Sequence, residues 1–260
     1  MPPQMDDNLL YSRNHLRNII HLVLVSLLVA SLNACKENVP PHELAIRGNT
    51  KALEKLIDAG LDINTRDQEG GTLLFNASAY GQIHTVSMLL AHKADTEIPA
   101  ALNKLTPIAV AAVQGDENVV RTLLKFGAKP VYKDSTGKIR SALAYAAATG
   151  RTSVVQLLLN HGAQPDQATD VDGNTELMIA AARGYQAIVE LLIKYGADPR
   201  RVNNSGESAY DRAARGGFFD IADKIKDAGS IKSKQVGRVD GEGWSRHISP
   251  KPTAAMADAS

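Results

Sequence analysis

The amino-acid sequence predicts an all-α fold, an α-solenoid of about six stacked repeats joined by short β-hairpin arms. The first observation is a glycine that recurs at intervals of 33 to 35 residues, at Gly48, Gly81, Gly115, Gly150, Gly184 and Gly217. A fixed period of this size is typical of supersecondary units that stack on one another. The second observation is a two-helix motif that surrounds the four central glycines in the same phase.

A short first helix is predicted before each central glycine. It begins after a hydroxyl residue, at Thr72, Thr106, Ser141 and Thr175. A hydroxyl oxygen at this position accepts a hydrogen bond from the free backbone N–H groups of the first turn. Small residues, often an alanine pair, follow and let neighbouring first helices approach closely. The glycine then supplies the positive φ that a tight turn between two helices often needs.

The second helix of each unit carries the pattern Val-x-x-Leu-Leu, or Val-x-x-Leu-Ile. The valines of the four central units are Val86, Val120, Val155 and Val189, and the two apolar residues stand three and four positions after each of them. Apolar residues at i, i+3 and i+4 form one buried stripe on a helix. Each stripe predicts a helix that packs its inner side on the row of first helices.

The segments between the units contain turn-forming residues and are predicted to be hairpin arms. The tips are Asp67–Gly70, Asp172–Asn174 and Asn203–Gly206, because Asp, Asn and Gly favour tight turns. Extra residues lengthen two further arms, around 98–104 and 134–140. Insertions in repeat arrays fall in loops on one face, so these two segments are expected outside the helices.

These units resemble the ankyrin repeat, whose pattern is Thr-Pro-Leu-His-x-Ala-Ala, then Gly, Leu-Leu and Gly-Ala-Asp. Four units carry it in phase, and a weaker unit at each end extends the resemblance to residues 42–230. Pro107 is the only proline at the second motif position, and the motif histidine is replaced in every unit except near His42. In this family the histidine ties repeats together, so its absence predicts looser coupling between the units.

The resemblance implies a monomeric protein-binding module that uses a concave face built from hairpin tips and first helices. In the family, contacts come from the ends of the first helices and from the arms. The matching positions are Gln68, Glu69, Tyr80, Leu102, Asn103, Gln114, Tyr145, Thr149, Asp172, Arg183, Asn204 and Glu207. Tyr80 and Arg183 rank first because Tyr and Arg are enriched at binding hot spots.

Residues 1–34 are predicted to be a signal peptide, because Arg13 and Arg17 precede an apolar run from Ile19 to Leu32. The run is shorter than the roughly 20 residues that span a bilayer. The sequence Leu-Asn-Ala-Cys that ends at Cys35 resembles the bacterial lipobox. It implies diacylation of the Cys35 thiol, with residues 35–41 as a short tether. An uncleaved signal anchor and ordinary cleavage remain the alternatives.

Similarity to enteric lipoproteins implies a periplasm-facing protein of the outer membrane, because Lys36 and not Asp follows the cysteine. Two uses are compatible with a tethered binder there. One is an immunity protein that blocks a toxin, and the other is an adaptor for envelope or oxidative-stress proteins.

Catalytic and nucleic-acid-binding functions find little support in the sequence. The formal net charge is +1, which gives no basic field for nucleic acid. No phosphate loop or Gly-x-Ser-x-Gly motif is present, and the seven histidines lack metal-ligand spacing. We therefore expect no enzyme activity, no cofactor and no metal. The alternative is an envelope enzyme, or an accessory of one, that uses the repeats as a platform.

The segment 231–260 lacks the repeat period and contains prolines, glycines and a closing run of small and polar residues. It is predicted to be a flexible tail. Trp244 is the only tryptophan of the chain. Docking of Trp244 on the last repeat and contact with a partner are the two alternatives to a mobile side chain.

Overall fold

The computed structural model describes residues 39–134, 137–166 and 172–235. The described residues from Pro41 to Gln235 belong to one compact unit. In its described part the helices come in pairs, one pair for each predicted repeat. The first helices are α2 (Pro41–Ile46), α4 (Leu73–Ala79), α6 (Pro107–Gln114), α8 (Ala142–Ala148), α10 (Glu176–Ala182) and α12 (Ala209–Arg215). The second helices are α3 (Thr50–Asp58), α5 (Ile83–Ala91), α7 (Glu117–Lys125), α9 (Thr152–Asn160), α11 (Gln186–Lys194) and α13 (Phe219–Gln235).

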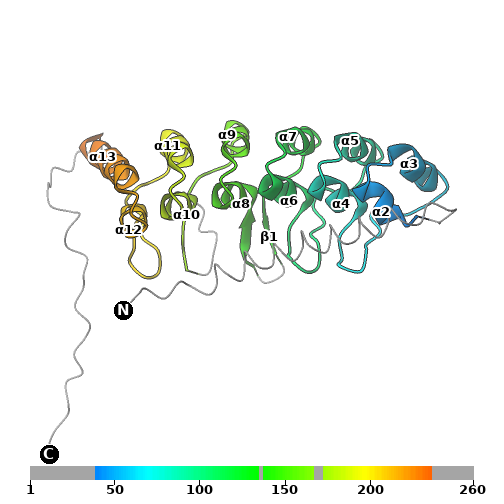
Figure 1. The fold of residues 1–260 in the computed structure, drawn as a ribbon, viewed down its shortest axis with the longest axis horizontal. Helices are drawn as coiled ribbons and strands as arrows, with labels where there is room; N and C mark the ends of the chain where they lie inside the picture. Colours follow the sequence, from blue (N-terminus) through cyan, green and yellow to red (C-terminus); the bar gives the residue numbers. More distant parts are fainter. Residues whose placement is uncertain (1–38, 135–136, 167–171, 236–260) are drawn as a thin grey trace, which may run out of the picture. The chain divides into compact units, whose positions relative to one another are not determined.

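The pairs stack into two rows, with first helices beside first helices and second helices beside second helices (Figure 1). The core lies between the rows and is apolar. It includes the fully buried residues Leu89, Leu123 and Leu158 from the predicted stripes of the second helices, and Leu73 and Ile108 from the first helices. The predicted all-α solenoid is therefore confirmed.

Hydroxyl caps begin three of the central first helices as predicted. The Thr72 hydroxyl accepts from the backbone N–H of Phe75 at 3.1 Å, and Ser141 and Thr175 make the equivalent contact. Helix α6 differs because Pro107 occupies its first position and the Thr106 hydroxyl forms no cap bond. Proline suits this position because its missing N–H would have no helical partner there.

The recurring glycine is required by two constraints that Gly184 illustrates. Its φ is +73°, and a Cβ added to it would lie 2.5 Å from the ring of Phe218 in the next repeat. The four earlier turn glycines meet the corresponding side chain of their own next repeat. These pairs are Gly48 with Gln82, Gly81 with Asp116, Gly115 with Arg151 and Gly150 with Tyr185. The glycine recurs for two reasons: it allows the turn within each repeat, and it leaves space for a side chain of the next repeat.

Hydrogen bonds from side chains outside the family motif join the repeats. Gln82 Nε2 donates to the Ile46 carbonyl at 2.8 Å, and Arg151 Nε donates to the Val113 carbonyl at 3.0 Å. Both carbonyls lie at the C-terminal end of a first helix, where helical partners are lacking. The expectation of looser coupling did not consider these donors, and the strength of the coupling between repeats stays a prediction.

The arms form hairpins where the turn residues predicted them. The Asp67 N–H donates to the Gly71 carbonyl at 2.9 Å, and the Asn203 N–H donates to the Glu207 carbonyl at 2.9 Å. Strands β1 (Val131–Lys133) and β2 (Ile139–Ser141) pair antiparallel, with Tyr132 opposite Arg140. Both lengthened segments lie outside the helices, as expected. The predicted tip near Asp172 adjoins residues 167–171, which are outside the described residues.

Helix α13 corrects the predicted end of the ordered array. It continues to Gln235, whereas the sequence was expected to lose structure from residue 231. Gly229 does not end this helix, unlike the closing glycines Gly127 and Gly162, which have a positive φ. No proline or second glycine follows before Gln235, so nothing in residues 230–235 breaks the helix.

Candidate protein-binding surface

The candidate surface consists of the arms together with the C-terminal ends of the first helices. We call it the first-helix face. Figure 1 shows the arms extending from the first helices on the side away from the second helices. All twelve predicted contact residues are in the described part of the chain. Exposed members are Gln68, Glu69, Leu102, Gln114, Asp172 and Asn204. Half-buried members are Tyr80, Asn103, Tyr145, Thr149, Arg183 and Glu207.

Leu102 is the most prominent apolar residue of the first-helix face, with 74% of its surface exposed. Its arm is closed by a hydrogen bond from the Ala100 N–H to the Leu105 carbonyl at 2.9 Å. The side-chain oxygen of Asn103 accepts from the Leu105 N–H at 2.9 Å. The local backbone therefore holds Leu102 out at the tip. Val202, on the last arm, is 56% exposed.

Tyr80 ends helix α4 beside two acidic residues. Burial raises the pKa of Tyr80, the charges of Glu43 and Glu69 act in the same direction, and together they bring it to about 12. The phenol therefore keeps its proton at neutral pH and can donate a hydrogen bond. Glu43 is paired with Arg47, so exposed Glu69 is the carboxylate beside Tyr80 that suits a basic group of a partner.

A polar network supports the same end of the first-helix face. Asn76 Nδ2 donates to Asp67 Oδ2 at 2.7 Å and lies 3.1 Å from His42 Nδ1. Burial lowers the pKa of His42, and the charge of Asp67 opposes that effect. The network links the first helices of the first two repeats to the first arm. It therefore fixes helix α4, and Tyr80 follows the last residue of this helix.

Arg140 is a residue of this face that sequence reasoning missed. Its Nε lies 3.1 Å from Asp134 Oδ2, and its Nη1 donates to the Tyr145 hydroxyl at 3.2 Å. Burial raises the pKa of the neighbouring Tyr132 to about 12, although Arg140 opposes this effect. Tyr145 therefore ties the β1–β2 hairpin to helix α8. The extra residues 134–140 were the only signal for this cluster.

Several predicted contact residues also make contacts within the chain. Arg183 Nη1 donates to the Ala148 carbonyl of the preceding repeat. Glu207 forms ion pairs with Arg212 and Arg215 of helix α12. The Thr149 hydroxyl donates to the Tyr145 carbonyl at 2.8 Å. For these residues, partner contact stays a prediction, and a substitution would also change stability.

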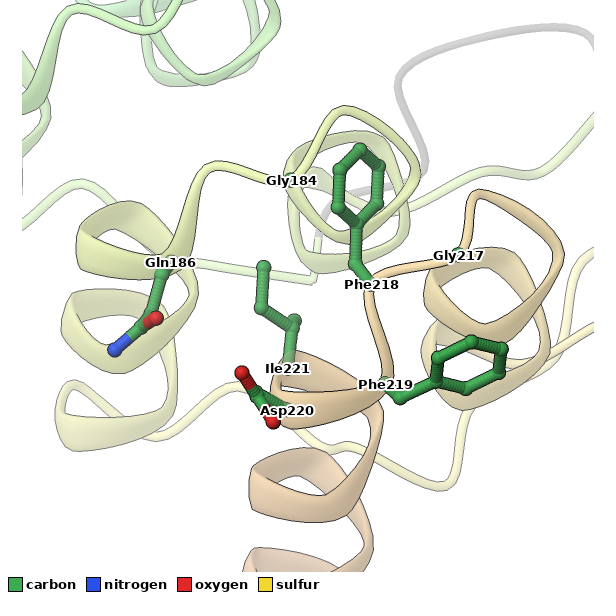
Figure 2. Close-up of a pocket in the computed structure, with 7 residues that line it drawn as sticks. All are labelled: Gly184, Gln186, Gly217, Phe218, Phe219, Asp220 and Ile221. Carbon is green, nitrogen blue, oxygen red and sulfur yellow. The ribbon is translucent and has the colours of Figure 1, made fainter.

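A shallow pocket of about 310 Å³ lies at the last repeat, outside the predicted set (Figure 2). Its lining residues are Gly184, Gln186, Gly217, Phe218, Phe219, Asp220 and Ile221. The two consecutive phenylalanines after Gly217 were a sequence signal that the prediction did not use. The lining is mainly apolar, with one carboxylate, and it suits packing rather than acid–base chemistry.

The described residues contain no group of three or more His, Cys, Asp and Glu side chains placed to hold a metal ion. In the same part of the chain, no helix has the length and apolar composition that crossing a membrane requires. Cys35 and Trp244, both singled out from the sequence, lie outside the described residues.

Known proteins support the fold. The 1.00 Å crystal structure of an ankyrin repeat domain from Acinetobacter baumannii superposes with a TM-score of 0.63 at 27% identity, over 74% of this chain and 99% of that chain. The ankyrin repeat domain of Bcl-3, a member of the IkappaB protein family, gives a TM-score of 0.65 at 24% identity. That match covers 75% of this chain and 88% of the Bcl-3 chain.

Sequence relatives match over part of their length. Ankyrin repeat and SOCS box protein 5 of Oryctolagus cuniculus is 33% identical over 99 residues, which are 38% of this chain and 29% of that protein. The human transient receptor potential channel A1 is 31% identical over 91 residues, 34% of this chain and 8% of the channel. This chain thus spans less than a third of either relative.

A family model described as ankyrin repeats in three copies matches residues 41–134 and again 143–235. These two matches cover the repeats whose geometry is given above. The chain therefore belongs to the ankyrin-repeat family.

Proposed function

We propose that this chain is a lipid-anchored scaffold of the bacterial envelope that binds a protein partner through the first-helix face. Ankyrin repeats mediate protein–protein interaction in general. The observation that carries the proposal is Leu102, which is 74% exposed at the tip of a lengthened and internally bonded arm. A large apolar side chain held in solvent on a fixed backbone suits insertion into a partner.

The surroundings of Leu102 define the chemistry of the partner. A Cβ added to Gly70 would lie 2.3 Å from the Cβ of Ala101, so the first arm packs against the Leu102 arm. This contact brings exposed Glu69 to the neighbourhood of Leu102. The complementary surface is an apolar pocket with a basic group beside it, since charged groups at the rim of an interface select the partner.

Lipidation at Cys35 would hold this surface at a membrane. Helix α2 begins at Pro41, so the tether after Cys35 is short. Two or more acyl chains give stable anchoring, whereas one chain binds only weakly. In cells fed an alkyne fatty acid, the wild type is expected to be labelled and Cys35→Ser unlabelled. Equal labelling of both would reject the anchor but leave the binding surface untouched.

Binding is tested with immobilised residues 36–260 and envelope extract. Leu102→Ser is expected to lose the captured partner, with a dissociation constant raised about 30-fold for a hot spot of about 2 kcal/mol. Phe126→Ser is the matched control, because Phe126 is 47% exposed but ends the second helix α7. If Leu102→Ser binds as the wild type and Phe126→Ser does not, the partner uses the second-helix row instead.

The identity of the captured protein separates the two biological uses. A toxin whose activity stops when it is bound supports an immunity role. A catalase or another stress enzyme that stays active when it is bound supports an adaptor role. An enzyme activity that needs this chain in the complex would support the alternative of an enzyme accessory.

A further inference from the structure

A hydrogen bond that recurs with the repeat period joins the segments that follow successive second helices. In each case a side-chain oxygen of one repeat accepts from a backbone N–H of the next repeat. The three bonds are Asp95 N–H to Asn64 Oδ1 at 3.0 Å, Lys129 N–H to Glu97 Oε1 at 2.9 Å and Asp198 N–H to Asp166 Oδ2. They cross the first, second and fourth of the five boundaries between repeats.

The third boundary, between the third and fourth repeats, cannot form this bond. Val131 stands at the acceptor position, because Ala-Lys-Pro-Val at 128–131 aligns with Ala-Gln-Pro-Asp at 163–166. A valine side chain has no hydrogen-bond acceptor. Val131 pairs with Ser141 in the β1–β2 hairpin, and Arg140 of that hairpin donates to Tyr145 of α8. The hairpin is therefore joined to the fourth repeat.

The second-helix row has a gap at the same boundary. Side chains link α3 to α5, α9 to α11 and α11 to α13, through the pairs Thr50–Thr85, Gln156–Tyr195 and Glu190–Lys224. Helices α7 and α9 lie side by side (Figure 1), yet within the described ranges no side-chain hydrogen bond or ion pair joins them.

The second boundary also lacks such a link between α5 and α7, but its arms are joined. Besides the Glu97 bond, Arg66 Nη1 donates to the Pro99 carbonyl at 2.9 Å. This bond connects the arm before α4 to the arm before α6. The third boundary is therefore the one at which both the recurring bond and the second-helix link are missing.

Apolar packing provides most of what remains at the third boundary. Val120 and Leu123 of α7 and Leu158 of α9 are fully buried. The bond from Arg151 to the Val113 carbonyl also crosses this boundary. Apolar burial is non-directional, whereas a hydrogen bond weakens steeply when its angle changes. Helices that are held mainly by apolar contacts can therefore slide a little over one another.

We propose that the boundary between the third and fourth repeats is a hinge, at which the first three repeats and the last three repeats move relative to each other. The hinge itself does not depend on the proposed function. Its consequence for binding does, because Tyr80 and Leu102 lie before the hinge and Thr149 and Arg183 lie after it. A partner that contacted both parts of the first-helix face would fix the angle between them.

Distances between spin labels test the hinge, because residues 36–260 contain no cysteine and labels can be attached to introduced ones. The second residue of a second helix is an exposed site in each repeat that is used. Three double-cysteine variants each span two boundaries, at Lys51 with Asn118, Asn118 with Ala187, and Ser153 with Asp220. By double electron–electron resonance, we expect a broader distance distribution for Asn118 with Ala187 than for the other two pairs.

Restoring the missing acceptor tests the cause of the hinge. Val131→Asn gives this position the amide of Asn64 and is expected to narrow the Asn118–Ala187 distribution to the width of the other pairs. Asn64→Val is the matched control, and it is expected to broaden the Lys51–Asn118 distribution while the circular dichroism stays unchanged.

Equal widths for the three pairs in the wild type would overturn the hinge, and this comparison needs no variant at Val131. A broad Asn118–Ala187 distribution that Val131→Asn leaves unchanged would reject the missing bond as its cause. If Val131→Asn does not fold, an unchanged Lys51–Asn118 width in Asn64→Val rejects the same cause, and a broadened one supports it.

Discussion

Replacing Glu176 with glutamine is expected to stabilise the protein above about pH 5. Glu176 is the first residue of helix α10, and 0% of it is exposed. Neither carboxylate oxygen forms a hydrogen bond of normal geometry in the described part of the structure. A buried charge without partners is costly, so the site favours the protonated acid. Glutamine has a similar shape and carries no charge at any pH.

The size of the effect follows from the pKa of Glu176. Burial raises it from 4.5 to about 8, with the charge of Asp166 acting in the same direction and Arg201 against it. The folded state therefore keeps a proton that the unfolded chain releases above pH 4.5. The stability is fully present below this pH and is lost as the pH rises toward 8. At about 1.4 kcal/mol per pH unit, the loss is about 3 kcal/mol at pH 7 and reaches about 5 kcal/mol above pH 8.

Urea denaturation followed by circular dichroism between pH 5 and pH 8 measures this loss. The wild type should become less stable with rising pH, and Glu176→Gln should be nearly flat by comparison. Glu190→Gln is the control, because Glu190 is exposed and its hydrogen bond from Lys224 lowers its pKa. Its contribution therefore changes only at lower pH. Parallel profiles for the wild type and Glu176→Gln between pH 5 and pH 8 would refute this account of the site.

Three further stability changes follow from the same structure and are measured by urea denaturation. Lys93→Gly should add about 0.5–1 kcal/mol, because Lys93 has a φ of +65° where α3, α7, α9 and α11 are each followed by a glycine of positive φ; a loss would mean that its side chain contributes more than this strain costs. Leu158→Ala should cost about 2–5 kcal/mol, because Leu158 is fully buried between the two rows; a cost near zero would contradict the assigned phase. Arg151→Ala should cost about 1 kcal/mol through the hydrogen bond to the Val113 carbonyl, and an unchanged midpoint would show that this bond does not couple the repeats.

The architecture was predictable because one physical requirement repeats along the chain. Gly184 needs a positive φ and leaves room for Phe218, so each repeat must place a glycine at the same distance. The stripe that contains Leu158 repeats for the same reason, since each second helix packs on the same kind of surface. Contacts that recur in every repeat require the same kind of residue at the same position of every repeat. This regularity can be recognised in one sequence.

The contacts that distinguish one repeat from another were not predictable. Arg140 finds Asp134 and Tyr145 only because the lengthened arm folds back as a hairpin over α8. Glu176 stands where the family pattern has proline, and nothing in the local sequence shows that it is completely buried. Both facts depend on how neighbouring arms and helices pack. Such contacts join residues of different repeats, or residues of the irregular arms, and leave no repeated pattern in the sequence.

The pH-dependent residue Glu176 and the proposed partner surface lie in different repeats of the array. In a stacked array, each repeat contacts its neighbours, so a local loss of stability acts mainly on adjacent repeats. Helix α10 packs against α8 and α12, so we expect ionisation of Glu176 to act mainly on this part of the array, near its C-terminal end. Leu102 and Tyr80 belong to earlier repeats, where the bonds among His42, Asn76 and Asp67 hold the first two repeats together. The proposed partner surface around Leu102 therefore lies in the part of the array that this pH-dependent site disturbs least.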